Sequence, residues 1–477
     1  MRRARSRTTR SFRLVALAAA FSLVAVACGD GDGEPEATDD PEETVTDESA
    51  DEPDDAADEP EVVDEPDDGA DDPPEPAGDA TTVTFWSWVP DIEMQIELFE
   101  AANPDIIVDH VNVGVGGEQY TQLRTAIRAG DVPDVAQIEF EALPSFIIAD
   151  ALVDLREQGA DDLDGVFAPG VWGAVQGEDG QIYSYPWDSG PMAMLYREDL
   201  FEEHGIDVPE TWDEFAQAAR DINASDPEVF LTNFNPQDPS WWWALVWQAG
   251  SRPFEAEGET LTIDIDDEPS QRVADYWGEL VADGVVPVDA PWTNDWYAGF
   301  NSGRYATWIT AAWGPSFLQG VAEDTEGLWR AAPMPQWSSG ENASSNWGGS
   351  SIAVMQGTEV PEAAERLARF LTSDPEAAQM FASEQLLFPA TVALLDSDEF
   401  RNQEPAFYGG QQVFDVFAAS SEAVDPSWQF APIQDSVNQF LTDAVGPRLD
   451  SGDLRPFLAE LEERTRTFAE EQGFQVP

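Results

Sequence analysis

From residue 81 onward, runs typical of strands alternate with runs typical of helices, and this alternation limits the fold more than any other feature of the chain. Residues 81–89 form a β-branched and aromatic run, and in 91–102 the apolar side chains recur close to helical spacing. The same signals predict a strand at 106–113, a helix at 118–129, a strand at 134–138 and a helix at 144–149. Together they predict an α/β fold with a largely parallel sheet.

In sheets of this kind, ligands bind beyond the carboxyl ends of the strands. At that edge we expect Trp86 and Trp88, which end the first predicted strand, and Glu139 and Glu141, which follow the third. An aromatic ring can stack on a small molecule, and a carboxylate accepts its hydrogen bonds. These four side chains are therefore candidate ligand contacts.

A second candidate lies in the middle of the chain, where two strand-like runs at 181–185 and 192–196 flank a short interruption. The interruption, 186–191, contains two prolines and a glycine, which break any continuous element and predict a turn or a crossover. It carries Trp187 and Asp188, an aromatic ring next to a carboxylate. The segment by itself is equally consistent with a surface turn whose tryptophan packs into the core.

The N-terminus has the features of a secretory signal. Residues 1–13 are basic, residues 14–27 are apolar, and Cys28 follows directly. The segment 25–28 resembles a bacterial lipobox, in which the cysteine is lipidated, although Ala25 replaces the usual leucine. The same residues fit an ordinary A-x-A cleavage site, so secretion without a lipid stays open. We expect a signal peptide at 1–27 and a lipid on Cys28, because the only cysteine stands at the cleavage point before a tether.

The segment 28–80 is expected to be a disordered tether. About half of its residues are Asp or Glu, and large apolar side chains are almost absent, so it cannot bury enough surface to offset chain entropy. Mutual repulsion should extend it. The folded part then begins at residue 81, and its length is enough for two lobes.

Composition excludes several classes of function. The net charge is -73 and all 22 basic residues are arginine, so nucleic acid would be repelled and is not an expected partner. A single cysteine allows no intramolecular disulfide and no cysteine metal site. His110 and His204 stand far apart, so we expect neither a metal site nor a catalytic histidine. The glycines at 114–117 lack the spacing of a dinucleotide site, and no cofactor is expected.

Several further segments follow one another in a characteristic order. They are VTFWSW (83–88), FEAANP (99–104), LRTAIRAGDVPDV (123–135), PWDSGPMAMLYREDL (186–200), GIDVPETWDEF (205–215), GRYATW (303–308) with Gly314-Pro315, WGGSSIAV (347–354) and the helix pair in 363–381. Their order and spacing resemble family 1 extracellular solute-binding proteins, the carbohydrate receptors of ABC importers. The resemblance covers nearly all of residues 81–477.

The resemblance implies a two-lobed periplasmic-binding-protein-like fold with a hinge and a ligand cleft between the lobes. Mapped onto this chain, the hinge crossings fall near 187–191, 347–352 and 408–410. Lobe one would comprise 81–190 plus 350–408, and lobe two 191–349 plus 409–477. We expect a monomer that closes on its solute by hinge motion.

The expected site follows from the chemistry of a sugar, whose apolar C–H face suits an aromatic plate and whose hydroxyls suit carboxylates. The chain has 18 tryptophans, and for each of them core packing is the alternative, most clearly in the helix-like segment 241–247. By position in the family pattern, the expected ligand contacts are Trp86, Trp88, Glu139, Glu141, Trp187, Asp188, Trp313, Trp347, Gly348 and Trp428.

The resulting prediction is a receptor, not an enzyme, that binds a mono- or oligosaccharide and delivers it to the membrane permease of an ABC importer. Its N-terminal lipid would hold it at the outer face of the cell membrane. A secreted glycoside hydrolase remains an alternative, since it too would need tryptophans and paired carboxylates. A receptor for a cationic solute such as a polyamine is the other alternative, because the chain is so acidic.

Overall fold

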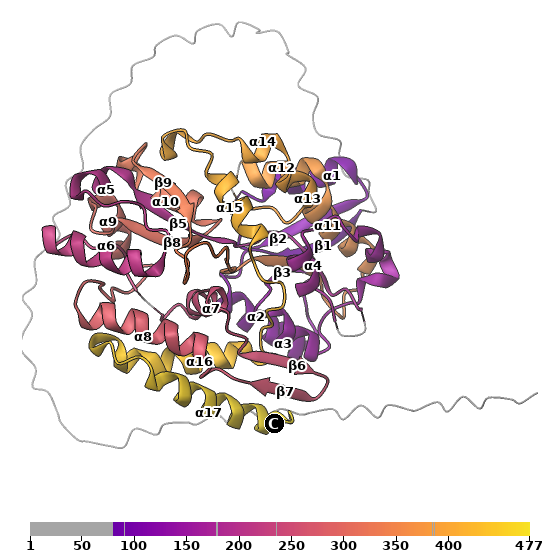
Figure 1. Cartoon of the computed structure of the whole chain (residues 1–477). Helices are drawn as coiled ribbons and strands as arrows, with labels where there is room; N and C mark the ends of the chain where they lie inside the picture. Colours follow the sequence, from indigo (N-terminus) through magenta and orange to yellow (C-terminus); the bar gives the residue numbers. More distant parts are fainter. Residues whose placement is uncertain (1–79, 90, 178–179, 235, 384, 386) are drawn as a thin grey trace, which may run out of the picture. The chain divides into compact units, whose positions relative to one another are not determined.

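A five-stranded sheet forms where the first strands were predicted (Figure 1). The computed structural model describes residues 80–477 except 90, 178–179, 235, 384 and 386; the predicted signal peptide, Cys28 and the tether lie outside the described residues. The strand order is β2-β1-β3-β10-β4. The strands are β1 (Thr81–Trp86), β2 (Ile106–Val111), β3 (Val135–Glu139), β4 (Ser184–Pro186) and β10 (Ser350–Val354).

The predicted parallel arrangement is confirmed for part of this sheet. Strand β1 pairs in parallel with β2 and β3, whereas β10 runs antiparallel to β3 and to β4. The expectation of a largely parallel sheet is therefore only half right, because β10 enters the sheet from the other direction. The helices of this first lobe are α1 (Glu93–Ala102), α2 (Gly117–Ala129), α3 (Leu143–Ile148), α4 (Pro169–Ala174), α11 (Pro361–Ser373) and α12 (Pro375–Ser383).

A second sheet of three strands, in the order β8-β5-β9, is antiparallel throughout. Its strands are β5 (Met192–Arg197), β8 (Thr307–Ala311) and β9 (Trp329–Pro333), and a hairpin adds β6 (Phe254–Glu257) and β7 (Thr260–Ile263). The surrounding helices are α5 (Glu198–His204), α6 (Trp212–Ser225), α7 (Pro239–Gln248), α8 (Glu268–Ala282), α9 (Asn294–Ser302), α10 (Gly314–Val321), α13 (Val392–Leu395), α14 (Asp398–Arg401), α15 (Val413–Glu422), α16 (Gln434–Val445) and α17 (Pro456–Glu471).

Local sequence explains where many of these helices begin. Helix α6 begins after Thr211, within the segment 205–215: the Thr211 side chain accepts a hydrogen bond from the Glu214 backbone, and the Glu214 side chain accepts one from the Thr211 backbone. Such a reciprocal cap satisfies backbone donors that the first turn leaves free. Helix α7 begins in a similar way, since Asp238 caps it and Pro239 fills its first turn. Within the described ranges, no helix combines the length and the apolar character of a membrane span.

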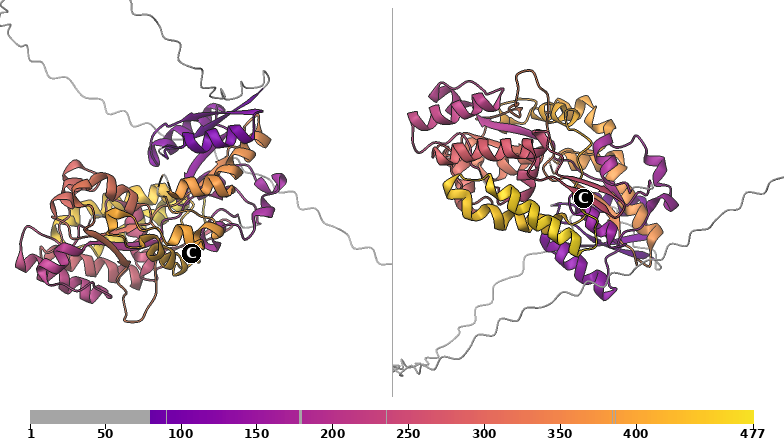
Figure 2. Two further views of the ribbon diagram at one scale, coloured as in Figure 1. Left: turned by 90° about the horizontal axis from the view of Figure 1, so that it is seen from above. Right: turned by 60° about the horizontal axis from the view of Figure 1, so that its bottom comes forward.

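Two separate hydrophobic cores support the two sheets. Phe85, Ile138 and Ile352 belong to the first core, and Trp242 and Ile309 to the second. Figures 1 and 2 show the same division, with the indigo N-terminal elements beside the orange helix α11, and the magenta and red elements beside the yellow C-terminal helices. The core of each lobe therefore combines segments that lie far apart in the sequence.

The segment after α12 joins the second core early. Ala390 packs in the first core, whereas Phe388, Leu394 and Phe400 pack in the second. The change of lobes begins within α12 itself, where Ala378 and Ala382 belong to the second core and Phe381 to the first, ahead of the crossing expected at 408–410. The lobe boundaries given above stay a prediction. The apolar side chains of α13 and α14 bear on them, because they pack in the second core although the predicted boundary assigns them to lobe one.

Two of the predicted crossings run side by side between the sheets. Strand β4 lies in one sheet and β5 in the other, and the segment between them pairs with the segment that leads to β10 through a bridge between Pro191 and Asn346. The Trp347 backbone N–H donates to the Gly190 carbonyl over 2.8 Å, and a Cβ on Gly190 would lie only 2.1 Å from the Trp347 carbonyl oxygen. Only glycine permits so close an approach of two backbones.

Candidate functional site

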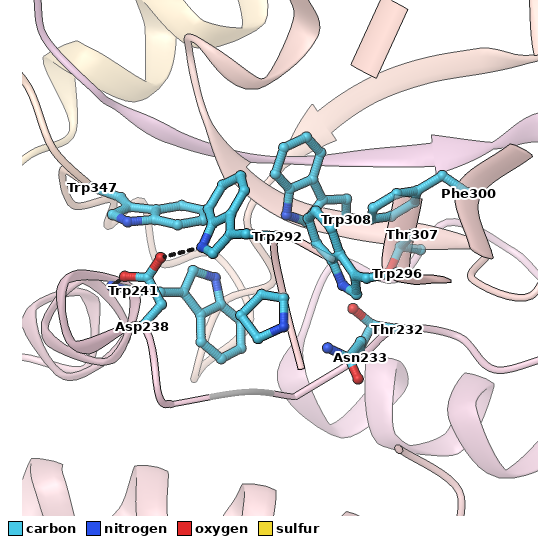
Figure 3. Close-up of a pocket in the computed structure, with 11 residues that line it drawn as sticks. Thr232, Asn233, Asp238, Trp241, Trp292, Trp296, Phe300, Thr307, Trp308 and Trp347 are labelled. Carbon is cyan, nitrogen blue, oxygen red and sulfur yellow. Dashed lines mark hydrogen bonds between the residues drawn. The ribbon is translucent and has the colours of Figure 1, made fainter. Parts of the chain in front are cut away.

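An aromatic pocket opens next to these crossings (Figure 3). The space between its lining side chains, counted together with open solvent at its mouth, is about 400 Å³, of which about 30 Å³ is free for a water-sized molecule. Five tryptophans line it together with a few polar side chains, so it offers flat apolar faces and a limited number of hydrogen-bonding groups. The lining residues are Thr232, Asn233, Asp238, Trp241, Pro291, Trp292, Trp296, Phe300, Thr307, Trp308 and Trp347.

Trp292 stands at the centre of this group. Its ring centroid lies 5.3 Å from that of Trp296 and 6.0 Å from that of Trp347, and its indole N–H donates to the Asp238 carboxylate over 3.2 Å. The side chain is nevertheless 40% exposed, which is unusual for a tryptophan surrounded by aromatic rings. Its φ of 62° is in the left-handed region, where a large side chain is strained.

The loop that carries Trp292 is anchored at Asp289. The Asn233 amide donates to the Asp289 carbonyl over 3.0 Å and accepts from the Asp289 backbone N–H over 2.9 Å. The Asp289 carboxylate accepts from Arg304 over 2.8 Å and from the Tyr305 hydroxyl over 2.6 Å. These contacts hold the loop from its base, and this is how a strained residue can persist three positions further on.

Asp238 is the acidic residue in the lining of the pocket, and it interacts electrostatically with Glu139 and Glu141, while Glu139 interacts in the same way with Asp188. Glu139 ends β3 and accepts from the Tyr120 hydroxyl over 2.7 Å, and Asp188 accepts from the Ser350 backbone N–H over 2.7 Å. Asp238, at the start of α7, takes part in the pocket itself. The fourth, Glu141, accepts from Ser240 Oγ over 2.7 Å and from the Asn438 amide over 3.4 Å. Two carboxylates thus come from the first lobe, one from a crossing and one from the second lobe.

Burial raises the pKa of every member of this group. It is the main cause of a pKa of about 6 for Asp188, about 7 for Glu139 and about 8 for Glu141, and it raises the pKa of Asp238 as well. The charge of Glu139 raises the pKa of Glu141 further, while hydrogen bonds from Tyr120, Ser240 and Ser350 oppose the shifts of their partners. In the described part of the chain, none of the four forms an ion pair with an arginine.

The structure brings several of the predicted residues together. The Trp313 indole N–H donates to the Trp347 carbonyl over 3.1 Å, and the two ring centroids lie 4.6 Å apart. Gly348 follows at a φ of 73°, and a Cβ there would lie 3.7 Å from Trp313 Nε1. Trp88 packs edge-on against Tyr120, the hydrogen-bond partner of Glu139. Trp313, Trp347 and Gly348 thus form one group, and Trp88 lies beside the pair of Tyr120 and Glu139.

Three other predicted tryptophans lie in different surroundings. Trp187 is 3% exposed and stacks on Phe381, with a centroid distance of 4.9 Å. Trp428 stacks on Trp247 at 4.9 Å and is also buried. Trp86 packs against the first core. As ligand contacts these three stay predictions, and the structure gives each of them packing partners.

Sequence analysis did not single out Asp238, Trp292, Trp296 or Trp308 as ligand contacts. Two of them carried a usable signal: Asp238 precedes Pro239 as a helix cap, and Trp292 follows Pro291 in a turn-like segment. Neither signal indicates that the side chains of Asp238 and Trp292 are in contact, because the two residues are far apart in the sequence. The residues that the structure describes contain no group of His, Cys, Asp or Glu arranged to hold a metal ion.

Comparison with known proteins places these features in a family. The family model described as bacterial extracellular solute-binding protein matches residues 79–378, more than half of the chain. The structure is similar to that of an ABC transporter associated binding protein from B. animalis subsp. lactis in complex with β-1,6-galactobiose, with a TM-score of 0.75 and 30% identity, covering 83% of this chain and 99% of that one.

Curated relatives extend the comparison. The arabinooligosaccharide-binding protein of Halalkalibacterium halodurans is 24% identical over 71% of this chain and 78% of its own length. The lactose-binding protein of Rhizobium radiobacter is 24% identical over 72% of this chain and 82% of its own length. The α/β fold with two lobes agrees with these similarities. The chain therefore belongs to the bacterial extracellular solute-binding protein family.

Proposed function

We propose that this protein is an extracytoplasmic receptor that binds a mono- or oligosaccharide between its lobes and delivers it to the permease of an ABC importer. The observation that supports this best is the tryptophan-lined pocket, which contains the Asp238 carboxylate, together with the electrostatic interaction of Asp238 with Glu139 and Glu141 of the other lobe. The relatives described above are sugar-binding proteins by name. We expect the protein to act as a monomer.

In the proposed complex, the apolar face of a sugar ring stacks on Trp292 or Trp347, the members of the pocket next to the crossings. Hydroxyl groups of the sugar donate to Glu139, Glu141 and Asp188. Trp88, Trp313 and Gly348, which are among the ligand contacts predicted from the sequence, complete the binding site. Stacking and directed hydrogen bonds together give both affinity and orientation.

Calorimetric titration of the purified protein with a panel of sugars tests this proposal. At least one mono- or oligosaccharide should bind with 1:1 stoichiometry and raise the melting temperature, because a ligand of the folded state stabilises it. Intrinsic fluorescence should change at the same time, since tryptophans line the site. A panel in which no sugar alters either signal would contradict the proposal.

One observation favours a hydrolase as the second candidate. Glu139 and Glu141 have pKa values of about 7 and about 8, and a glycoside hydrolase needs one carboxyl group that stays protonated near neutral pH. Both residues, however, belong to the same strand end, whereas such an enzyme places its two carboxyl groups on either side of the scissile bond. Incubation of the bound sugar with the protein separates the two functions: we expect no product, and steady hydrolysis would identify an enzyme.

We also propose that the chain is anchored by a lipid on Cys28, at the outer face of the cell membrane. The cysteine follows an apolar segment and precedes an acidic segment of about fifty residues, a suitable spacer between a membrane and a receptor. Replacement Cys28→Ser should move the protein from the membrane fraction to the medium or the soluble fraction. A variant that stays in the membrane fraction would rule out the lipid anchor.

A further inference from the structure

We propose that the solute carries a positive charge, and that the site accommodates an amino sugar or an oligosaccharide that ends in one. This inference rests on the proposed sugar-binding function and specifies the class of sugar. It depends on three observations: uncompensated negative charge, an aromatic enclosure beside a carboxylate, and a buried donor at the opposite end of the pocket.

The negative charge at the site has no counterpart within the described ranges. Glu139, Glu141, Asp188 and Asp238 have hydroxyl, amide or indole partners and no arginine. Arg124 of α2 interacts with Tyr120, the partner of Glu139, but it is occupied by an ion pair with Asp435 of α16. The carboxylates can accept hydrogen bonds from the hydroxyls of a neutral sugar, but an ammonium group would in addition neutralise part of their charge.

The aromatic rings make the pocket suitable for an organic cation. Rings of Trp292, Trp308 and Trp347 lie within 6.0 to 6.5 Å of one another, and the Asp238 carboxylate holds the Trp292 indole by its N–H. The faces of indole rings attract cations, and a carboxylate at their edge adds to the attraction. An ammonium group on a sugar ring can occupy such a position while the C–H face of the ring stacks.

The opposite end of the pocket carries a donor without an acceptor. Trp296 is 4% exposed, and its Nε1 has no hydrogen-bond partner among the described residues. Figure 3 shows the nitrogen edge of this ring turned toward Thr232 and Asn233, away from Asp238. A buried donor is costly to leave unpaired, so a ligand oxygen is the expected partner. A purely hydrocarbon cation offers no such oxygen, whereas the ring or hydroxyl oxygen of an amino sugar does.

The charge of the site depends on pH in a defined way. The groups that face it are Glu139 and Glu141 after β3, Tyr120 of α2, Asp188 in the crossing and Asp238 at α7. The pKa values of about 6 to about 8 mean that acidification protonates the carboxylates and removes the attraction. Affinity for an amino sugar should therefore rise from pH 5 to neutral pH and fall again where the amine loses its proton.

Matched pairs of sugars test the inference on the full-length protein. We would titrate glucosamine against glucose, galactosamine against galactose and mannosamine against mannose, and the corresponding β-1,4-linked disaccharides of glucosamine and glucose, at pH 7 and low salt. In each pair of monosaccharides an ammonium group replaces the hydroxyl at one carbon, and in the disaccharides it does so on both rings. In at least one pair the amine should bind ten times more tightly or better, and this preference should shrink in high salt because ions screen the attraction.

Two variants separate charge from shape. Glu141→Gln keeps groups that can pair with Ser240 and Asn438 but cannot ionise beside a bound ammonium group, so it should weaken binding of the amine at least threefold more than binding of the neutral partner. Glu257→Gln removes one charge from an exposed position in β6 and should leave the preference unchanged. A residue with a merely structural role would affect both sugars alike.

The possible results of these titrations test the inference and the proposed function separately. If neutral sugars bind and each amine binds equally or more weakly, the inference is wrong and the proposed sugar receptor stands. If no sugar of either kind binds, the proposed function fails, and the inference fails with it. If amines without a sugar ring, such as spermidine, bind more tightly than every amino sugar, the solute is a cation of another class and the inference is overturned.

Discussion

Trp292 adopts a backbone conformation that tryptophan rarely takes. Its φ of 62° costs about 1–2 kcal/mol for a residue with a Cβ, and its ring still remains 40% exposed at the pocket. The anchor of the loop at Asp289 and the hydrogen bond to Asp238 offset this cost. Strain of this kind is common where a side chain must be held in place for a ligand.

The role of Trp292 can be measured with two substitutions that both remove the ring. Trp292→Gly also relieves the strain, so its free energy of unfolding should exceed that of Trp292→Ala by about 0.5–1 kcal/mol. Both variants should weaken sugar binding by about 1–3 kcal/mol through lost stacking area. Urea denaturation measures the free energy of unfolding, and calorimetric titration measures the affinity for the sugar. If both variants bound the sugar as tightly as the parent protein, Trp292 would not be a ligand contact.

Glu141 allows a second prediction, on stability against pH. Its pKa in the folded state is about 8, above the value of about 4.3 expected when unfolded, so the folded state binds more protons between these limits. The protein without ligand should therefore lose stability as the pH rises from 5 to 9. Glu141→Gln should be more stable than the parent protein at pH 9, by at least about 1 kcal/mol, and closer to it at pH 5. If the midpoint of urea unfolding changed equally with pH in Glu141→Gln and in the parent protein, the prediction would be wrong.

At the scale of elements, the crossings depend on close backbone contact. Gly190 and Gly349 both lie there, and a Cβ on Gly349, whose φ is 97°, would lie 2.9 Å from the Phe140 ring. The first crossing pairs with the second through Pro191 and Asn346. These contacts fix the hinge segments relative to each other, and bulkier residues would force them apart.

Gly190→Ala should destabilise the protein by about 1–3 kcal/mol, because its Cβ would lie 2.1 Å from the Trp347 carbonyl oxygen and the crossings must separate. A matched control is Gly320→Ala in α10, where a Cβ meets nothing within 4 Å and a helix favours alanine. Chemical denaturation of both variants tests this. Equal stability of Gly190→Ala and the control would show that the crossings adjust without cost.

Some of the helices and strands could be predicted from the sequence, whereas contacts between distant segments could not. Strands and helices from β1 to α3 were predictable, because the periodicity of apolar side chains is local. The meeting of Asp238 with Trp292 was not, since 54 positions separate them and no local pattern records the contact. The burial of Trp187 depends in the same way on Phe381, a residue from α12.

At the scale of the whole described fold, the two lobes contact each other at one side of the site. Glu141, which follows β3, bonds to Ser240 of α7 and Asn438 of α16, and Arg124 of α2 pairs with Asp435 of α16. All of these contacts link a segment of the first sheet's lobe to a helix of the second. Because lobes of this family type are joined by hinges, contacts of this kind exist only while the lobes are together.

The ion pair between Arg124 and Asp435 should therefore slow the dissociation of the sugar. Its side chains are 37% and 38% exposed, so its contribution should be only about 0.2–1 kcal/mol. Asp435→Ala should raise the dissociation rate constant by up to about fivefold, leave the association rate constant nearly the same, and lose its effect at high salt. Stopped-flow fluorescence, which reports on the tryptophans of the site, measures both constants.

The matched control for this prediction is Asp275→Ala. It breaks the ion pair with Arg455. Both side chains are 51% exposed and both lie in the second lobe, Asp275 in α8 and Arg455 directly before α17. A pair within one lobe is present in the open and the closed states alike, so its loss should leave both rate constants unchanged. If Asp275→Ala accelerated dissociation as much as Asp435→Ala, the effect would reflect general loss of surface charge pairing, and the Arg124–Asp435 pair would have no specific part in closure.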